Sequence, residues 1–560
     1  MSTADDSFQA VALGSSACAA KWTYVNEGKR YLVCAYAGDD SRRPPLRGKV
    51  VIRLLKVAVN EAEPAGELIS HDELALGLEG TCDALSNELL FTEKIISRLF
   101  GERYIARGKE VVVVSKSFLQ QLSENISCRR PAGRREKSDI YNKSKSSGES
   151  GKYFAILEED VSTLRSDSGN IAYVSTEIKV KCGLQSTSPF IYRHMDERRF
   201  KLKIGKYAIS QIYKSRTSSS LGENPEEKRQ AQECEWGKFA GISDYSPQDI
   251  CSRTRTRVSR ALESLFINPQ NNLRILCNNK VLHSCDVNYN DNGLSIAEVF
   301  TELEAAPLSS QKRIYFDIIN KVLCFEPIAE LLQVLQIDPL DIEGVDVLYS
   351  RLVHLAANGE DSSVFGLNSD DLNKVIDNGV FCGTFSQLVN AIIACSSGSG
   401  ANDDVSGDFS GDPVAGHLRR LRSLQLDPSM ADGEAELRYR EACLWANALD
   451  AELCIAFINM FLLSLLARDA SIIISIGNRR AIYCENCTDS TTIDAIQSID
   501  IEEMQTGNHD GCIQIHYDNG LHVLYSCRVR LIDLSPKPSS KIKKKIENES
   551  HICSVYMANC

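Results

Sequence analysis

The sequence predicts a soluble protein of mixed helices and strands that folds into two or more lobes. At 560 residues, the chain is longer than a single hydrophobic core usually supports. Residues 171–181 alternate in polarity as a β-strand does, whereas residues 84–100 repeat apolar side chains at helical spacing. The longest apolar run, residues 453–467, is interrupted by Asn459 and is too short to cross a bilayer. We therefore expect a buried helix there and no membrane insertion.

The charge balance restricts the partners. The formal net charge of −12 disfavours a protein coated for nucleic acid or for an anionic membrane, so any anion site must be a local basic pocket. The twenty cysteines follow no regular frame, and the polar, acidic stretch from Met1 to Asp6 predicts no signal peptide. Reduced thiols in the cytoplasm or nucleus fit this pattern best. Residues 1–20 are expected to be disordered.

The strand predicted at residues 171–181 carries an unusual row of charges. Glu177, Lys179 and Lys181 fall on one face, at spacings of roughly 6.5–7 Å. The apolar or small side chains of Val174, Thr176, Ile178 and Val180 fall on the other face. Such a row can hold adjacent phosphates without the ordering of a loop. The alternative is a solvated strand face with opposite charges side by side.

The first part of the chain predicts a sheet with helices beside it. Strands are expected on both sides of the turn Gly28-Lys29-Arg30, and at residues 49–55, 110–115 and 153–159, with a helix over 84–100 closed by Gly101. The turn could lay backbone N–H groups over phosphates, or it could be an ordinary hairpin. Residues 129–135 form a basic cluster that suits polyphosphate or is an exposed loop, and residues 136–152 form a polar linker.

The second part of the chain is mostly helical. Helices are expected at residues 253–266, 328–335, 340–357 and 434–467, a loop over 216–249, and a flexible insertion over 396–412. Asp469 precedes an apolar strand at 472–476, where an acid is costly unless it is paired or faces a cleft. A second strand, residues 525–533, ends in Asp533, and an aspartate in that position is a usual ligand for Mg²⁺ beside ATP phosphates.

Several short strings resemble one enzyme family in sequence order. Residues 177–183, Glu-Ile-Lys-Val-Lys-Cys-Gly, resemble the Glu-x-Lys-Pro-Lys-x-Gly signature of the inositol-pentakisphosphate 2-kinases. The Gln-Asn-Asn-Leu-Arg string at 270–274, Leu-Asp-Ile-Glu-Gly at 340–344, Arg-Asp-Ala-Ser at 468–471 and Asp-Leu-Ser-Pro-Lys-Pro at 533–538 are also similar to family strings. The resemblance runs from Trp22 to about Lys545. The Walker A string and the His-Arg-Asp and Asp-Phe-Gly strings of other kinase classes are absent from the sequence.

The resemblance implies an α+β, two-lobed, inositol-polyphosphate-kinase-like fold. Residues 21–190 would form the lobe on the ATP side, residues 191–547 the lobe on the inositide side, and residues 548–560 a tail. The implied reaction transfers the γ-phosphoryl group of ATP, with Mg²⁺, to the 2-hydroxyl of inositol 1,3,4,5,6-pentakisphosphate, which gives the hexakisphosphate. We expect the protein to act as a monomer, without a specific nucleic-acid partner.

The resemblance also implies the site residues. Those expected on the nucleotide are Gly28, Lys29, Arg30, Arg53, Glu158, Asp160, Glu177 and Arg274, with Asp533 on Mg²⁺. Asp469 is expected to accept or orient the hydroxyl proton, and Lys179 to steady the transferring phosphoryl group. Together with Asp469, those expected on the inositide are Arg134, Lys181, Lys206, Asn271, Lys537, Lys541 and Lys545.

Departures from the family pattern leave alternatives open. Lys29 and Arg30 replace small residues of the turn, and the family tryptophan, proline, histidine and lysine are replaced by Gly133, Val180, Lys203 and Tyr207. These changes would also suit a diverged inositol-polyphosphate-binding protein without catalysis, and a plain interaction scaffold is a third interpretation. Separately, Cys484, Cys487, His509 and Cys512 could bind zinc or belong to a variable surface loop.

Overall fold

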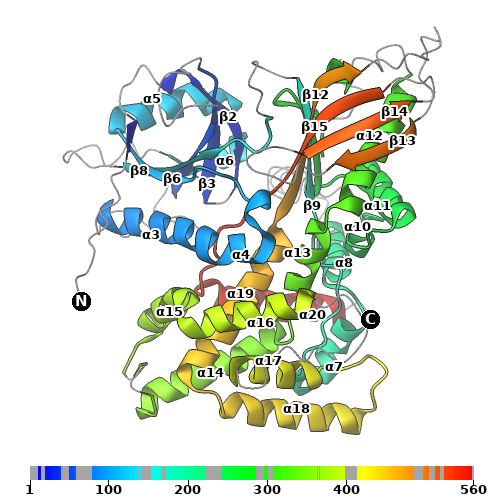
Figure 1. Ribbon diagram of the computed structural model, residues 1–560. Coiled ribbons are helices and arrows are strands. Elements are labelled where there is room, and N and C mark those ends of the chain that lie inside the picture. The colour runs from blue at the N-terminus through cyan, green and yellow to red at the C-terminus, as the bar shows by residue number, and fades with distance from the viewer. Residues whose placement is uncertain are drawn as a thin grey trace.

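The computed structural model shows a protein of mixed helices and strands (Figure 1). The α+β class expected from the sequence is therefore confirmed. The structure describes residues 11–13, 19–28, 30–38, 50–58, 78–136, 138–140, 153–164, 172–220, 241–285, 287, 296–300, 307–361, 363–364, 366–397, 413–482, 496–502, 511–517 and 522–557. The strands of this part form a six-stranded sheet, a seven-stranded sheet and a small two-stranded sheet.

The six-stranded sheet is built from the first part of the chain. Its order is β1-β6-β8-β4-β3-β2, and only the β1–β6 pair is parallel. The bounds are β1 Val11–Leu13, β2 Trp22–Glu27, β3 Tyr31–Tyr36, β4 Val50–Leu55, β6 Glu110–Val114 and β8 Tyr153–Glu159. β1 corrects the expected disorder of residues 1–20 for this segment, because its backbone pairs with the otherwise open edge of β6. The small sheet joins β5 Val57–Ala58 to β7 Ser138–Asp139. β7 lies within residues 136–152, which were expected to form a linker.

The seven-stranded sheet gathers strands from distant parts of the chain. Its order is β11-β10-β9-β12-β15-β14-β13, and every neighbouring pair is antiparallel. The bounds are β9 Tyr173–Lys179, β10 Leu273–Cys277, β11 Lys280–His283, β12 Ser471–Ile482, β13 Ile496–Glu502, β14 Gly511–Tyr517 and β15 His522–Ile532. β9 hydrogen-bonds to β10 and β12, so it belongs to this sheet and not to the sheet of residues 11–159.

β9 is buried on both faces. Glu177 is 9% exposed, and Ser175 and Thr176 are also buried. Ser175 and Ser475 hydrogen-bond to each other at 2.9 Å, and Glu177 lies opposite Arg274 in the register with β10. The alternative of a solvated strand face is therefore wrong, because a central strand covered on both sides leaves only its end open to solvent.

Helices surround both sheets and form a layer beneath the seven-stranded sheet (Figure 1). The longer ones are α3 Leu78–Phe91, α5 Lys116–Ile126, α8 Lys206–Ser220, α11 Arg255–Ile267, α12 Leu308–Phe325, α13 Ile328–Gln336, α14 Asp341–Asn358, α15 Ser369–Asn378, α16 Gly383–Ser397, α17 Pro413–Ser423, α18 Asp432–Asn447, α19 Ala451–Asp469 and α20 Lys541–Met557. Four-residue helices are α4 Ser97–Phe100, α6 Ala132–Arg135, α7 Met195–Arg198 and α10 Pro247–Ile250. Short 3₁₀ and π segments are η1 Thr92–Ile96, η2 Glu102–Tyr104, η3 Ser127–Arg129, η5 Pro189–His194, η6 Arg199–Leu202, η8 Ile296–Glu298 and η10 Gly379–Phe381.

Three helical predictions need correction. The single helix expected over 434–467 is two helices, because Asp450 caps the start of α19 by accepting from the Leu453 N–H at 2.8 Å. The loop expected over 216–249 contains the end of α8 and the first three residues of α10. The tail expected from residue 548 continues α20 as far as Met557. Of the insertion expected over 396–412, residues 396–397 belong to the end of α16, and residues 398–412 lie outside the described part.

α19 is the central helix of the larger core. Of the described helices, α19 alone is long and apolar enough to cross a membrane. However, 83% of its most apolar 18-residue stretch is buried inside the protein. Its apolar side chains face protein on every side, as in the core helix of a globular protein. The predicted buried helix over 453–467 is confirmed.

The helical segment from α3 to α4 joins the two sheets. Leu85 on α3 packs with Val111 and Ile156 of the six-stranded sheet. Ten and fifteen residues later, Ile95 and Phe100 belong to the large core of the seven-stranded sheet and its helices. The segment ends at Gly101, whose φ of 85° suits glycine, as predicted. One continuous segment therefore fixes part of both sheets.

Candidate functional site

The site begins where β9 ends. The Lys179 N–H donates to the Asn272 carbonyl at 2.9 Å, which ties the end of β9 to the turn before β10. Lys181 follows with a φ of 54°, in the left-handed region that a lysine rarely adopts. This backbone conformation directs the chain away from the sheet and lets the end of β9 present its lysines beside α19 and β15.

Lys179 meets the end of β15. Its ammonium lies 3.5 Å from the carboxylate of Asp533, whose side chain is half-exposed. The Ser471 hydroxyl lies 3.4 Å from the same carboxylate oxygen. Burial alone would lower the pKa of Lys179, but Asp533, followed by Glu177 and Asp469, raises it above its ordinary value. Lys179 therefore stays charged.

Asp469, the last residue of α19, forms the second ion pair. Its carboxylate lies 3.0 Å from the ammonium of Lys537, four residues beyond Asp533. Burial alone would raise the pKa of Asp469, but the charges of Lys537, Lys181 and Lys545 hold it well below the ordinary range. Asp469 is therefore a carboxylate at every physiological pH.

We call these six residues the aspartate–lysine cluster. It comprises Lys179, Lys181, Asp469, Asp533, Lys537 and Lys545, from the ends of β9, α19 and β15 and the start of α20. Four ammonium groups face two carboxylates, so the cluster carries a formal excess of two positive charges. All six were predicted site residues. The excess positive charge of the cluster can attract a polyanion, and its two carboxylates would then lie beside that polyanion.

Lys181 is the most strongly perturbed lysine of the cluster. Burial lowers the pKa of Lys181 to about 8, with Asp469 opposing that fall and Lys179 and Lys214 adding to it. The half-buried Lys214 comes from α8 and was not a predicted site residue. An arriving anion would relieve the repulsion among these cations, so the arrangement favours binding of negative charge.

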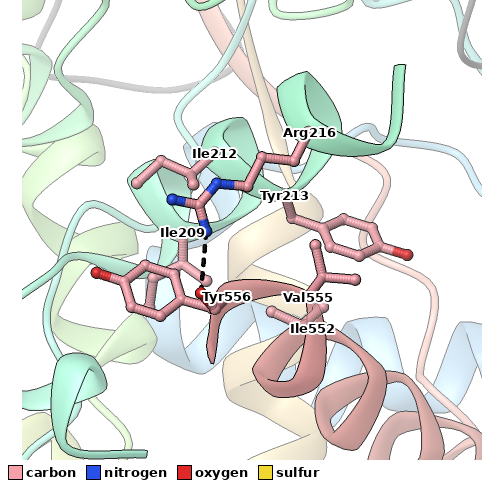
Figure 2. Close-up of a pocket in the computed structure, with 7 residues that line it drawn as sticks. All are labelled: Ile209, Ile212, Tyr213, Arg216, Ile552, Val555 and Tyr556. Atoms are coloured by element: carbon pink, nitrogen blue, oxygen red, sulfur yellow. Dashed lines mark hydrogen bonds between the residues drawn. The ribbon is translucent and has the colours of Figure 1, made fainter. Parts of the chain in front are cut away.

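α20 carries further predicted cations and is packed against α8 (Figure 2). Lys541 begins α20, where its N–H donates to the Pro538 carbonyl at 3.1 Å, and Lys545 lies one turn later. Figure 2 shows the far end of the helix, where Arg216 donates to the Tyr556 carbonyl at 3.1 Å. This contact holds α20 in place, which orients the first turn with its lysines.

Lys206 is drawn into a separate network of buried charges. Its ammonium lies 3.2 Å from Asp341 and 3.9 Å from Asp338. Lys201 pairs with the same Asp341 at 3.1 Å, and with Glu343 and Glu549. The Leu-Asp-Ile-Glu-Gly string at 340–344 thus has a structural role, and its Asp341 binds Lys206.

Arg53 and Glu158 lie together on the six-stranded sheet. The Arg53 guanidinium is 3.1 Å from Glu88, 3.8 Å from Glu158 and 2.8 Å from the Ser535 hydroxyl. Glu158 also pairs with Lys109 at 3.2 Å. Sequence reasoning singled out neither Glu88 nor Ser535. Ser535 lies two residues beyond Asp533, so Arg53 reaches the aspartate–lysine cluster from the opposite sheet.

The segment after β8 is fixed to the seven-stranded sheet. Glu159 pairs with Arg528 of β15 at 3.0 Å, and both side chains are only 3% exposed. Asp160 accepts from the Ser162 N–H at 3.0 Å, which closes a turn. The chain between Glu158 and Asp160 therefore crosses from one sheet to the other at a defined point. Arg528 is a buried structural residue that its sequence context did not reveal.

The predicted phosphate turn lies beside a predicted inositide residue. The Gly28 N–H donates to the Tyr31 carbonyl at 2.9 Å, and Arg134 of α6 lies 3.4 Å from the Gly28 carbonyl. Arg30 is partly exposed and lies 3.9 Å from Glu88. Lys29 lies outside the described residues. The turn and Arg134, far apart in sequence, thus share one edge of the six-stranded sheet.

A buried ion cluster supports this turn. Glu27 accepts from Lys56 at 3.0 Å and from Arg130 at 2.9 Å, and all three side chains are 1–2% exposed. Lys56 also donates to the Gly28 carbonyl at 2.8 Å. The basic stretch 129–135 is therefore not simply an exposed loop, because Arg130 is a buried structural residue.

We expect Glu27→Gln to destabilise the protein by about 3–5 kcal/mol, because it leaves Lys56 as a buried cation without its anion and Arg130 with Asp139 alone. Urea unfolding would measure the loss. The exposed Glu124 of α5 gives a matched control, and Glu124→Gln should change stability by less than about 0.5 kcal/mol. Equal stability of the two variants would contradict the structural role of Glu27.

The remaining predicted residues lie on β10, in the turn before it or outside the described part. Arg274 reaches the six-stranded sheet, where it donates to the Val25 carbonyl at 3.5 Å. Asn271 is exposed, whereas its neighbour Asn272 is buried and donates to the Tyr207 hydroxyl at 3.0 Å. Of the proposed zinc ligands, Cys484, Cys487 and His509 lie outside the described residues, so that alternative stays open.

The comparisons with known proteins agree on one family. The family model described as inositol-pentakisphosphate 2-kinase matches residues 24–551. An inositol-pentakisphosphate 2-kinase from rice, Oryza sativa, is 24% identical over 345 residues, which cover 59% of this chain and 69% of the rice protein. The Arabidopsis thaliana enzyme of that name is 24% identical over 352 residues, covering 60% and 70%. The Danio rerio enzyme is 26% identical over 265 residues, covering 47% and 44%.

The match to the family model spans nearly the whole chain and includes every residue of the aspartate–lysine cluster. The resemblance stated from short strings is therefore confirmed over the length that those strings covered. This chain is a member of the inositol-pentakisphosphate 2-kinase family.

Proposed function

We propose that this protein transfers the γ-phosphoryl group of ATP to the 2-hydroxyl of inositol 1,3,4,5,6-pentakisphosphate to give inositol hexakisphosphate. Membership of the family supports this reaction, and the relatives in rice, Arabidopsis and zebrafish carry its name. The observation that carries the proposal is the aspartate–lysine cluster, in which Asp469 and Asp533 lie among four lysines.

The charge of the cluster suits the substrate. Five phosphates carry roughly −8 to −10 charges, at about −1.5 to −2 each. Lys181, Lys537 and Lys545 lie in the cluster, with Lys541 at the start of the same helix and Arg134 on the opposite sheet. We assign these five cations to the inositide. Lys206 is left out, because its ammonium lies in the separate buried network of Asp341 and Asp338.

The roles of the two aspartates follow from their surroundings. Asp469 accepts a hydrogen bond from the 2-hydroxyl and orients it for attack, a role that suits a carboxylate whose pKa lies too low to store a proton. Lys179 stabilises charge on the transferring group, because its own pKa is raised and it remains cationic.

Asp533 fits a magnesium ligand. Its carboxylate is half-exposed, and its charged neighbour Lys179 is 3.5 Å away, beyond a tight ion pair. Magnesium in such enzymes is held by one or two carboxylates and by substrate phosphates. When bound, the metal would offset charge between phosphate oxygens.

The two sheets support a two-lobed, kinase-like arrangement, which we propose as the finer description of the fold. ATP would lie between the lobes, with Arg53, Arg274 and the turn at Gly28 on its phosphates and the chain from Glu158 to Asp160 near its base. Arg53 and Ser535 touch across the two sheets at 2.8 Å, which supports a phosphate site near Asp533. We further propose a monomer that works in the cytoplasm or nucleus.

The decisive experiment is incubation of the purified protein with labelled ATP, Mg²⁺ and the pentakisphosphate. We expect labelled hexakisphosphate, with the label on the 2-position. Tight binding of the pentakisphosphate without turnover would instead indicate the non-catalytic binding protein. Neither binding nor turnover would indicate a scaffold and would overturn the proposal.

The pH dependence tests Lys181. Lys181 attracts the inositide while it is protonated, that is, below a pKa of about 8, and it loses this attraction as the pH rises through that value. We expect kcat/KM for the inositide to fall above about pH 8. Lys181→Arg, which stays charged, should remove this alkaline limb, whereas Lys203→Arg, at an exposed lysine, should leave it in place. An unchanged limb in the Lys181→Arg protein would contradict the assignment.

A further inference from the structure

Glu88 is a buried carboxylate with an unusual set of partners. It lies on α3 and is 3% exposed. Its oxygens accept from the Tyr31 hydroxyl at 2.5 Å and from the Ser535 hydroxyl at 2.8 Å, and pair with Arg53 at 3.1 Å and Arg30 at 3.9 Å. Burial alone would raise the pKa of Glu88, but the two arginines lower it, so the group is charged.

Ser535 closes a triangle with Glu88 and Arg53. Its hydroxyl donates to Glu88 and accepts from Arg53, each at 2.8 Å, while Arg53 and Glu88 are 3.1 Å apart. Arg53 lies on β4 of the six-stranded sheet and Glu88 on α3 beside it. Ser535 lies in the segment that follows β15 of the seven-stranded sheet. A closed ring of charge-assisted contacts holds its members more rigidly than one bond would.

The position of Ser535 gives the triangle a functional consequence. Ser535 lies midway between Asp533 and Lys537, which each form an ion pair of the aspartate–lysine cluster. Asp533 has a φ of 63°, a backbone conformation that persists only where the surrounding structure enforces it. On the far side of the segment, the Ser539 N–H donates to Asp377 at 2.8 Å. The segment is thus held at Ser539 by a residue of α15, and at Ser535 by residues of the six-stranded sheet and α3.

We propose that Glu88 and Ser535 are positioning residues that hold the 533–537 segment against the six-stranded sheet. This contact sets the place of Asp533 and Lys537 and aligns the nucleotide side of the site with the inositide side. The inference rests on the proposed function for its catalytic consequence, but the contact itself can be tested without turnover.

The first test measures the segment in the unliganded protein. Ser535→Ala should speed amide hydrogen exchange by about tenfold or more in a peptide covering 533–540, because it removes two hydrogen bonds to charged groups, one to Glu88 and one from Arg53. Ser535→Thr, which keeps the hydroxyl, should exchange within about twofold of the native protein. Ser540→Ala alters an exposed serine of the same segment and should change nothing. Thermal melting confirms that each variant is folded.

The second test measures the catalytic consequence. Ser535→Ala should raise the Mg²⁺ concentration for half-maximal turnover and the KM for ATP by about tenfold. The KM for the inositide should rise by a smaller factor, because Lys537 is one of five cations assigned to it. Glu88→Gln should shift the same two constants. The two changes should not add in the double variant, because either one opens the triangle. A merely structural role would lower the melting temperature without separating the two KM values.

The outcomes separate the inference from the function. Unchanged exchange and unchanged Mg²⁺ dependence in Ser535→Ala would overturn the inference, as would fully additive effects of Glu88→Gln and Ser535→Ala. If even the native protein shows no turnover, the proposed function fails, whereas the exchange measurement still decides whether Glu88 and Ser535 hold the segment.

Discussion

Asp533→Asn should reduce turnover by about 10³-fold or more while the protein still binds inositol pentakisphosphate. The amide removes the charge proposed to hold Mg²⁺ and the partner of Lys179 at 3.5 Å. Binding of the polyanion should persist or tighten, because a negative charge leaves a cluster in which lysines predominate. Radiolabelled phosphoryl transfer and calorimetric titration with the inositide measure the two effects separately.

A matched control lies on the same sheet. Asp500 is an exposed aspartate of β13, an edge strand of the seven-stranded sheet, and Asp500→Asn should keep native kinetics. Native turnover in Asp533→Asn would exclude Asp533 as the magnesium ligand. Loss of both turnover and inositide binding would instead indicate that the change had disordered the cluster.

Asp469→Asn should reduce kcat by about 10²- to 10⁴-fold, the range usual for loss of a group that handles the reacting proton. The KM for ATP should change little, because Asp469 pairs with Lys537 on the inositide side of the cluster. The inositide should bind more tightly, since Lys537 loses its carboxylate and becomes available to phosphate. Steady-state kinetics with each substrate varied in turn would show this pattern.

The acid side of the pH profile gives an independent check on Asp469. The lysines keep the pKa of Asp469 well below its ordinary value of about 4. The carboxylate therefore stays charged at neutral pH, and it gains a proton only at a pH below that ordinary value. Native enzyme should therefore show no acid limb from Asp469 near neutral pH. If Asp469→Asn retained full turnover, the orienting role would be wrong.

Local patterns were enough to predict most elements of the fold. β9, α11, α13 and α14 were expected from alternation or helical spacing, because the period of the apolar residues records which face is buried. The helix break before α19 was missed, since one capping residue, Asp450, decides it within a pattern that is helical on both sides. β1 was missed because a three-residue strand has too short a pattern and depends on the edge of β6.

The site was partly predictable for a similar reason. Asp469, Asp533 and Lys179 were identified because each lies at the end of a strand or helix within a recognisable string. Lys206 was assigned to the inositide, but the structure pairs it with Asp341, a partner more than a hundred residues away. Glu88 had a weak signal, since it lies three residues after the buried Leu85 on an amphipathic helix. Ser535 had none, because a serine between Leu534 and Pro536 indicates no particular contact.

The sequence by itself determined the family, the element types and the acidic and basic groups available for phosphoryl transfer. These follow from short-range order, since neighbouring residues fix hydrophobic period, turns and local strings. Only the tertiary structure decided which charges neutralise one another and which remain for a ligand. Ion pairs depend on distances of a few ångströms between segments hundreds of residues apart, and the packing of two sheets sets those distances.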